Sequence, residues 1–272
     1  MTRLSSLHLL TAVTVFTLAA LTACQWKPWQ NASPAEHHVT VQRFDRIESL
    51  YLTTGDFSAL QHLNLSFPMQ TRTLIEDILK IGQVDERDIN STFLNFYQDT
   101  TLQTLIAETQ LQYAQMDDID SELSAAFARL QQWFPSLEVP LIYAQIGALD
   151  QSIVVSNGAV GVSLEKYLGK DYPLYKRYGY SPQHLQTMGR DFVVPDILSF
   201  YLLSLYPLSN FEESTQQERD EHMAKIQWVV NCALSRQVFK SVFIDRVEKY
   251  MKQYKHTPMP ELLTSVHLLS TK

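Results

Sequence analysis

The residues that could support metal chemistry are few and widely spaced in this sequence. Glu218 and His222 stand four residues apart, which places both side chains on one face of a helix. A zinc site needs three or four converging ligands, and the signature His-Glu-x-x-His does not occur. Because residues 219–221 are all charged, we interpret the pair as part of a solvated helix face. The sequence therefore predicts no metal site.

A catalytic serine is the next chemistry to test, and Ser163 is the candidate. It lies in the sequence GVSLE (residues 161–165), which lacks the second glycine of a nucleophile elbow and follows a hairpin strand. We interpret Ser163 as a strand-end residue or a helix N-cap. The chain has only 8 glycines and contains neither a phosphate-binding loop nor a dinucleotide fingerprint. We therefore expect no catalytic residue, no cofactor and no enzymatic activity.

Residues 167–180 form a segment of unusual composition, with five tyrosines, two glycines and three basic residues. Tyrosine combines a broad apolar face with a hydroxyl group, and such clusters serve recognition. Alternatively, the rings pack this long loop onto the domain while their hydroxyls satisfy backbone groups. Buried ion pairs between Asp171 or Asp196 and Arg177 or Arg190 are a further expectation. The candidate binding residues are Tyr167, Leu168, Gly169, Asp171, Tyr175, Tyr178, Arg190 and Asp196.

Cys24 has the clearest predicted chemistry, which is lipidation. A basic start at Arg3 and an apolar run over residues 7–21 precede the quartet LTAC (residues 21–24). These features are typical of a secretory signal, and the run is shorter than the roughly 20 residues that span a bilayer. The quartet resembles the lipobox of bacterial lipoproteins, which implies cleavage before Cys24 and stable anchoring by acyl chains on its thiol. The alternative is an ordinary signal with a chance cysteine at its end.

The remaining chain has the composition of a folded, mildly acidic protein. Cleavage before Cys24 leaves 249 residues, and the formal charge falls from −7 to −8 because only Arg3 is lost. With 45% apolar and 19% charged residues, the composition is that of a globular protein without an electrostatic footprint for nucleic acid. Gln25 is not the aspartate that retains enterobacterial lipoproteins in the inner membrane. We therefore expect an outer-membrane anchor that faces the periplasm.

The pattern of apolar residues predicts a mainly α protein with a small antiparallel hairpin or sheet, an α+β fold. We expect a leader over residues 1–23, a tether over residues 24–40 and one domain over residues 41–272. The clearest helical stripe is Ile119, Leu123, Ala126, Phe127, Leu130 and Phe134. A strand is predicted at residues 141–145, and Asn157-Gly158 predicts a type I′ hairpin between residues 153 and 162. Further helices are predicted at residues 196–206, 214–238 and 241–254, and a short one from residue 260.

Three of these segments carry a family resemblance. Residues 134–140 (FPSLEVP), 161–172 (GVSLEKYLGKDY) and 190–196 (RDFVVPD) resemble the GldB family of Bacteroidota lipoproteins, which is associated with gliding motility. Residues 43–45 (RFD) resemble its opening motif, and the likeness covers roughly residues 43–239. The resemblance implies a non-catalytic envelope lipoprotein that binds another envelope protein of the gliding or type IX secretion machinery. The alternative is a periplasmic, peptidase-like hydrolase with an unrecognised active site.

The layout of strands followed by a helix is also similar to that of zinc peptidases. The helix that would carry the metal ligands runs through residues 190–203 and contains no histidine. This similarity implies a degenerate zinc-peptidase-like architecture that binds without cutting.

Overall fold

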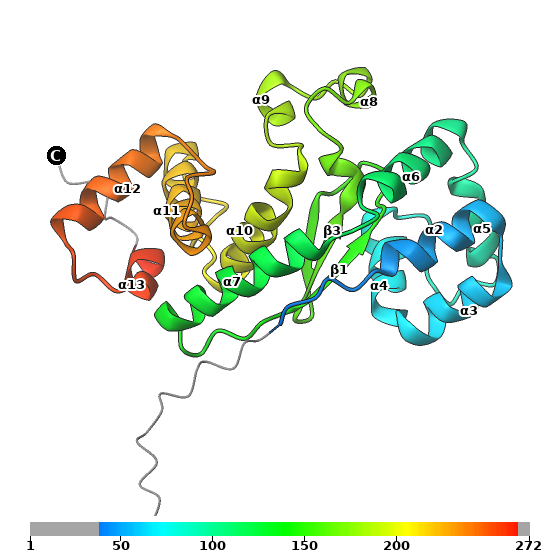
Figure 1. Cartoon of the computed structure of the whole chain (residues 1–272), viewed down its shortest axis with the longest axis horizontal. Helices are drawn as coiled ribbons and strands as arrows, with labels where there is room; N and C mark the ends of the chain where they lie inside the picture. The colour runs from blue at the N-terminus through cyan, green and yellow to red at the C-terminus, as the bar shows by residue number, and fades with distance from the viewer. Residues whose placement is uncertain (1–37, 266–272) are drawn as a thin grey trace, which may run out of the picture. The chain divides into compact units, whose positions relative to one another are not determined.

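The computed structural model describes residues 38–265, and most of them are helical (Figure 1). Cys24, the leader and most of the predicted tether lie outside the described residues. Within residues 38–265, no helix is both long enough and apolar enough to cross a membrane. The mainly α fold with one small sheet, which the sequence predicts, is confirmed.

The chain before the sheet is a run of helices. They are α2 (Phe44–Thr54), α3 (Phe57–Ser66), α4 (Pro68–Arg72), the π-helix η1 (Thr73–Ile78), α5 (Ile89–Phe96), α6 (Thr100–Gln112) and α7 (Asp117–Trp133). All the apolar residues of the predicted stripe on α7 are buried. The sequence does not predict the π-helix, in which the Leu79 N–H binds the Leu74 carbonyl at 2.8 Å. Such i→i+5 turns are rare and occur mostly as single-turn insertions within α-helices.

The sheet has the strand order β1-β3-β2 and is built from β1 (Leu141–Gln145), β2 (Ile153–Ser156) and β3 (Ala159–Ser163). The predicted hairpin is confirmed, with positive φ angles of 49° at Asn157 and 75° at Gly158. The sheet is mixed, because β1 pairs parallel to β3 beside the antiparallel hairpin. The hairpin reverses the chain, so β3 runs opposite to β2 and in the same direction as β1. It lies between these two strands.

The chain after the sheet is again helical. Its elements are η2 (Leu164–Tyr167), α8 (Pro173–Arg177), α9 (Pro182–Leu185), η3 (Arg190–Phe192), α10 (Val193–Leu205), α11 (Gln216–Leu234), α12 (Val242–Gln253) and α13 (Met259–Thr264). Three of these helices and the short last one match the predicted segments to within a few residues. Thr215 and Glu218 form a capping box that begins α11, so Glu218 serves as a helix-start residue.

The sheet separates two hydrophobic clusters, because alternate side chains of a strand point to opposite faces. Ile142, Ala144 and Val162 belong to the larger cluster, which α7, α10 and α11 also line. Tyr143 faces the other cluster, together with α2, α3 and η1. Figure 1 shows α2 to α5 on one side of the sheet and α10 to α13 on the other. The end of β1 therefore lies where both halves of the domain meet.

Candidate functional site

The most unusual backbone of the described chain is at residues 146–149, the loop that follows β1, which we call the braced loop. Ala148 and Leu149 have φ angles of 52° and 67°, although neither is a glycine. Left-handed backbone costs such residues on the order of 1–3 kcal/mol each and persists only where surrounding groups impose it. The braced loop is therefore held by its neighbours, and strained loops of this kind are concentrated at functional sites.

Glu165 holds the centre of the braced loop. Its Oε1 atom accepts hydrogen bonds from the Gly147 N–H at 2.9 Å and the Leu149 N–H at 3.0 Å. Backbone N–H groups that converge in this way form an anion-binding concavity, and this one is filled by the chain's own carboxylate. A Cβ atom at position 147 would lie 2.7 Å from Ser163 Oγ, so a glycine is needed beside the carboxylate.

Glu48 of α2 and Tyr97 at the end of α5 hold the first residue of the braced loop. The Ile146 N–H donates to Glu48 Oε2 at 2.9 Å, and the Tyr97 hydroxyl donates to the Ile146 carbonyl. Both side chains are completely buried. The helices on one side of the sheet therefore reach the loop through buried polar groups.

Lys166 and Tyr180 hold the last residue of the braced loop. The Lys166 ammonium donates to the Leu149 carbonyl at 3.1 Å and to the Tyr180 hydroxyl oxygen at 2.6 Å. The Tyr180 hydroxyl donates to the same carbonyl at 3.0 Å. The 161–172 segment, which carries the most specific family resemblance, thus supplies both an anion and a cation to this loop.

The two carboxyl groups at the braced loop titrate abnormally. Complete burial raises the pKa of Glu48 well above its usual value, the Ile146 N–H opposes this, and the charges of Glu165 and Asp45 raise it further. Burial also raises the pKa of Glu165 to about 7, although backbone N–H groups and Lys166 favour its charged form. Such an enclosed pair of carboxyls can hold a proton or a cation. In the described part of the chain, no three His, Cys, Asp or Glu side chains come together as a metal site.

Two tyrosine rings of the segment at residues 167–180, the tyrosine segment, lie in the core of the domain. Tyr167 and Tyr175 are buried, and the Tyr175 hydroxyl donates to the Glu165 carbonyl at 2.6 Å while it accepts from the Leu168 N–H at 2.8 Å. Tyr167 and Tyr175 therefore pack into the domain, as the packing alternative expects. Among the five rings of this segment, only Tyr178, with 58% of its surface exposed, is exposed to solvent.

Gly169 and Asp171 occupy the turn that leads into α8. Gly169 has a φ angle of 116°, which a side chain would strain, and its N–H donates to the Met188 carbonyl at 2.8 Å. Asp171 is exposed. The glycine thus shapes the turn, and the aspartate remains available at the surface.

Arg190 and Asp196 do not form the expected ion pairs with Asp171 and Arg177. Arg190 binds the carboxylate of Asp118 at 2.7 Å, and its guanidinium stacks on the Tyr113 ring at 4.8 Å. Asp196 accepts a hydrogen bond from the Tyr167 hydroxyl at 2.8 Å. The expectation is wrong because each group meets a nearer partner on a packed helix, which the linear spacing does not reveal.

A surface groove lies beside the tyrosine segment, between α6 and α8. It is lined by Thr100, Thr101, Thr104, Glu108, Tyr172, Pro173, Leu174 and Arg177. The groove therefore offers a half-buried tyrosine, a cation and a carboxylate, and the exposed Tyr178 follows Arg177 in sequence.

Comparison with known proteins identifies the family of this chain. A model of the family described as gliding motility protein GldB matches residues 25–219. This chain belongs to the GldB family. No curated protein and no solved structure matches the chain. The GldB match spans the braced loop, the tyrosine segment and the groove.

Sequence reasoning missed the residues that brace the loop in this GldB chain, above all Glu48, Tyr97 and Glu165. Glu165 and Lys166 follow an apolar strand directly, and a charged pair at that point is a usable signal for buried polar groups. Glu48 offers no such signal, because a glutamate in an amphipathic helix is normally exposed.

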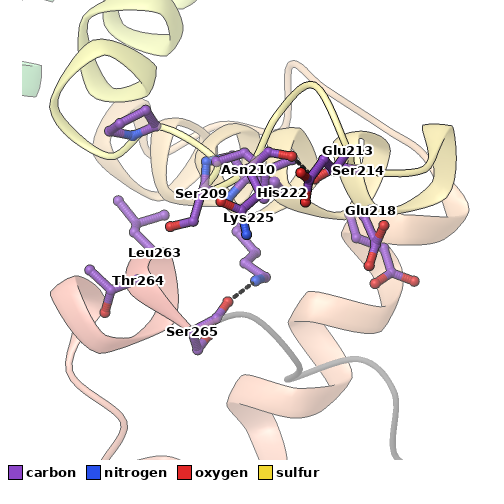
Figure 2. Close-up of a pocket in the computed structure, with 13 residues that line it drawn as sticks. Ser209, Asn210, Glu213, Ser214, Glu218, His222, Lys225, Leu263, Thr264 and Ser265 are labelled. Atoms are coloured by element: carbon purple, nitrogen blue, oxygen red, sulfur yellow. Dashed lines mark hydrogen bonds between the residues drawn. The ribbon is translucent and has the colours of Figure 1, made fainter.

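The GldB match ends partway through a second pocket, which is shown in Figure 2. This pocket, of about 220 Å³, is lined by the loop before α11, by α11 and by the end of α13. His222 lies in it, and its Nε2 is 2.8 Å from the Tyr206 carbonyl, while the Lys225 ammonium donates to the Ser265 carbonyl at 2.5 Å. Because His222 is buried, the interpretation of Glu218 and His222 as a solvated face is wrong for the histidine.

Proposed function

We propose that this GldB-family chain is a lipid-anchored, non-catalytic lipoprotein of the cell envelope that binds another protein of the gliding or type IX secretion machinery. The family match over residues 25–219 is the observation that carries this proposal. The LTAC quartet supplies the anchor, and Gln25 after the cysteine favours the outer membrane with the domain facing the periplasm.

Burial supports a binding role rather than a catalytic one. Glu48 and Glu165 are the two carboxyls that bind the braced loop, and both are completely enclosed. General acid–base catalysis requires hydrogen-bond contact with a substrate. We therefore assign these two side chains to holding the braced loop in place.

The groove between α6 and α8 and the adjacent Tyr178 are our proposed partner surface. Exposed tyrosine and arginine dominate the energetics of protein interfaces, because each joins a large contact area with directional hydrogen bonding. Arg177 lines the groove and Tyr178 follows it in sequence. A partner with an acidic or carbonyl-rich edge and an apolar contact for Tyr178 fits this surface.

A photo-crosslinking amino acid at position 178 tests this surface in cells of a host that carries the gene. Tyr254 on the end of α12 is a matched control, since it is an exposed tyrosine, with 47% of its surface exposed, outside the family match. We expect an envelope-protein adduct from position 178 and none from position 254. Equal adducts from both positions, or none from position 178, contradict the proposed surface.

A further inference from the structure

Three buried oxygen atoms at the braced loop have no hydrogen-bond partner in the described part of the chain. They are Oε1 of Glu48, Oε1 of Gln145 and Oε2 of Glu165, and all three side chains are completely buried. A buried polar atom without a partner costs about 1–3 kcal/mol, and more when it is charged. Native proteins nearly always satisfy such atoms, so three of them at one place indicate an occupant.

Hydrogen bonds made by the other polar atoms of these three side chains place all three residues near the start of the braced loop. Glu48 and Glu165 accept the N–H groups of the consecutive residues Ile146 and Gly147. Gln145 Nε2 donates to Ser163 Oγ at 3.2 Å, and that oxygen lies against the α-carbon of Gly147. Three elements, α2, β1 and η2, therefore each bring one side chain with an unpartnered oxygen to the start of the braced loop.

The cations of the surrounding protein are engaged elsewhere. The Lys166 ammonium is directed to the Leu149 carbonyl and the Tyr180 hydroxyl. Arg43 binds the carboxylate of Asp45 at 2.7 Å. No hydrogen bond joins the carboxyls of Glu48 and Glu165 to each other among the described contacts, although their charges interact. Lys166 therefore favours the charged form of Glu165 without bonding to its carboxylate, and no described ion pair joins a basic side chain to either glutamate.

We propose that a divalent cation, Ca²⁺, binds between Glu48, Gln145 and Glu165. Two carboxylates and an amide oxygen are the donors that hard cations prefer, and no histidine or cysteine is present to favour zinc. Ca²⁺ accepts irregular oxygen sets at 2.3–2.6 Å, whereas Mg²⁺ demands a near-ideal octahedron and gives up water reluctantly. Two carboxylates would match the charge of the ion, which would join α2 to the braced loop. This inference is independent of the proposed partner binding.

Metal titration of the detergent-solubilised lipoprotein, after removal of ions with a chelator, tests the site. We expect one Ca²⁺ per chain by isothermal titration calorimetry and a higher melting temperature with Ca²⁺ than with Mg²⁺. Terbium should bind in place of Ca²⁺ and luminesce on tyrosine excitation, because Tyr97 and Tyr143 interact with Glu48. No binding of either ion overturns the proposal.

Three variants distinguish a bound cation from a bound proton or water molecule between these side chains. Glu165→Gln keeps the shape of the side chain and should weaken Ca²⁺ binding by at least about tenfold. Loss of a residue that only hydrogen-bonds to a metal ligand already lowers metal affinity roughly 10- to 100-fold. Gln145→Glu adds a third carboxylate and should tighten binding. Asp191→Asn removes an exposed charge away from the braced loop and should leave binding unchanged.

The response of Gln145→Glu decides between the occupants even if Glu165→Gln folds poorly. Tighter Ca²⁺ binding and a larger rise in melting temperature support the cation site. If this variant is destabilised with and without Ca²⁺, the oxygens hold a proton or water and the proposal is wrong.

Discussion

Truncation of Tyr175 measures how much of the tyrosine segment is core. The ring is completely buried and packs against Tyr172 and Tyr180, with ring centroids 5.0 and 5.7 Å away. Removal of a buried aromatic ring costs about 3–5 kcal/mol. Loss of its hydroxyl also leaves the Leu168 N–H and the Glu165 carbonyl without their partner. We therefore expect Tyr175→Ala to lower the free energy of unfolding by about 4–6 kcal/mol.

Two further variants divide this effect into packing and hydrogen bonding. Tyr175→Phe keeps the ring and should cost about 1–3 kcal/mol, the penalty for backbone groups left unsatisfied. Tyr178→Ala removes an exposed ring and should change stability by no more than about 0.5 kcal/mol. Urea denaturation followed by circular dichroism gives all three values. If Tyr175→Ala and Tyr178→Ala have the same small effect, Tyr175 is a surface residue and the packing argument is wrong.

Two other predictions concern backbone fit and ionisation. Gly161→Ala should destabilise the chain by about 1–3 kcal/mol in the same denaturation assay, because the new Cβ would lie 2.5 Å from the Tyr143 ring; an unchanged midpoint contradicts this close packing. Burial raises the pKa of Asp196 to about 7 against the opposing hydrogen bond from Tyr167, so the folded state binds this proton more tightly than the unfolded state. The stabilisation from this bound proton is present below about pH 4 and is lost as the pH rises through 7. Asp196→Asn should therefore stabilise the chain at pH 8. It should also flatten the profile of stability against pH between 4 and 7. The exposed Asp191→Asn serves as the control, and identical profiles for wild type and Asp196→Asn contradict the assignment.

Local sequence signals predicted much of the fold, because they depend on neighbouring residues only. Asn157-Gly158 fixes the hairpin through its positive φ angles, and the stripe on α7 follows from helical periodicity. The parallel pairing of β1 with β3 was not predictable in this way. A five-residue apolar strand has the same pattern whichever partner it takes, and the pairing is set by how the hairpin packs.

The candidate site was harder to predict, because its chemistry depends on burial. Tyr175 and Tyr178 stand in the same segment, yet one is core and the other is surface. Glu48 and Glu165 are far apart in the sequence and meet only where α2 and η2 reach the loop after β1. Hydropathy assigns such glutamates to the surface, so the polar contacts of the braced loop emerge only from the folded structure.

The proposed envelope role depends most on the lipid anchor at Cys24. Mass spectrometry of the N-terminus of protein purified from envelope membranes tests this anchor directly. We predict that the first residue is Cys24 and that its thiol carries a diacylglyceryl group. An N-terminus at another residue, or an unmodified Cys24 in membrane-bound protein, contradicts a lipid-anchored role.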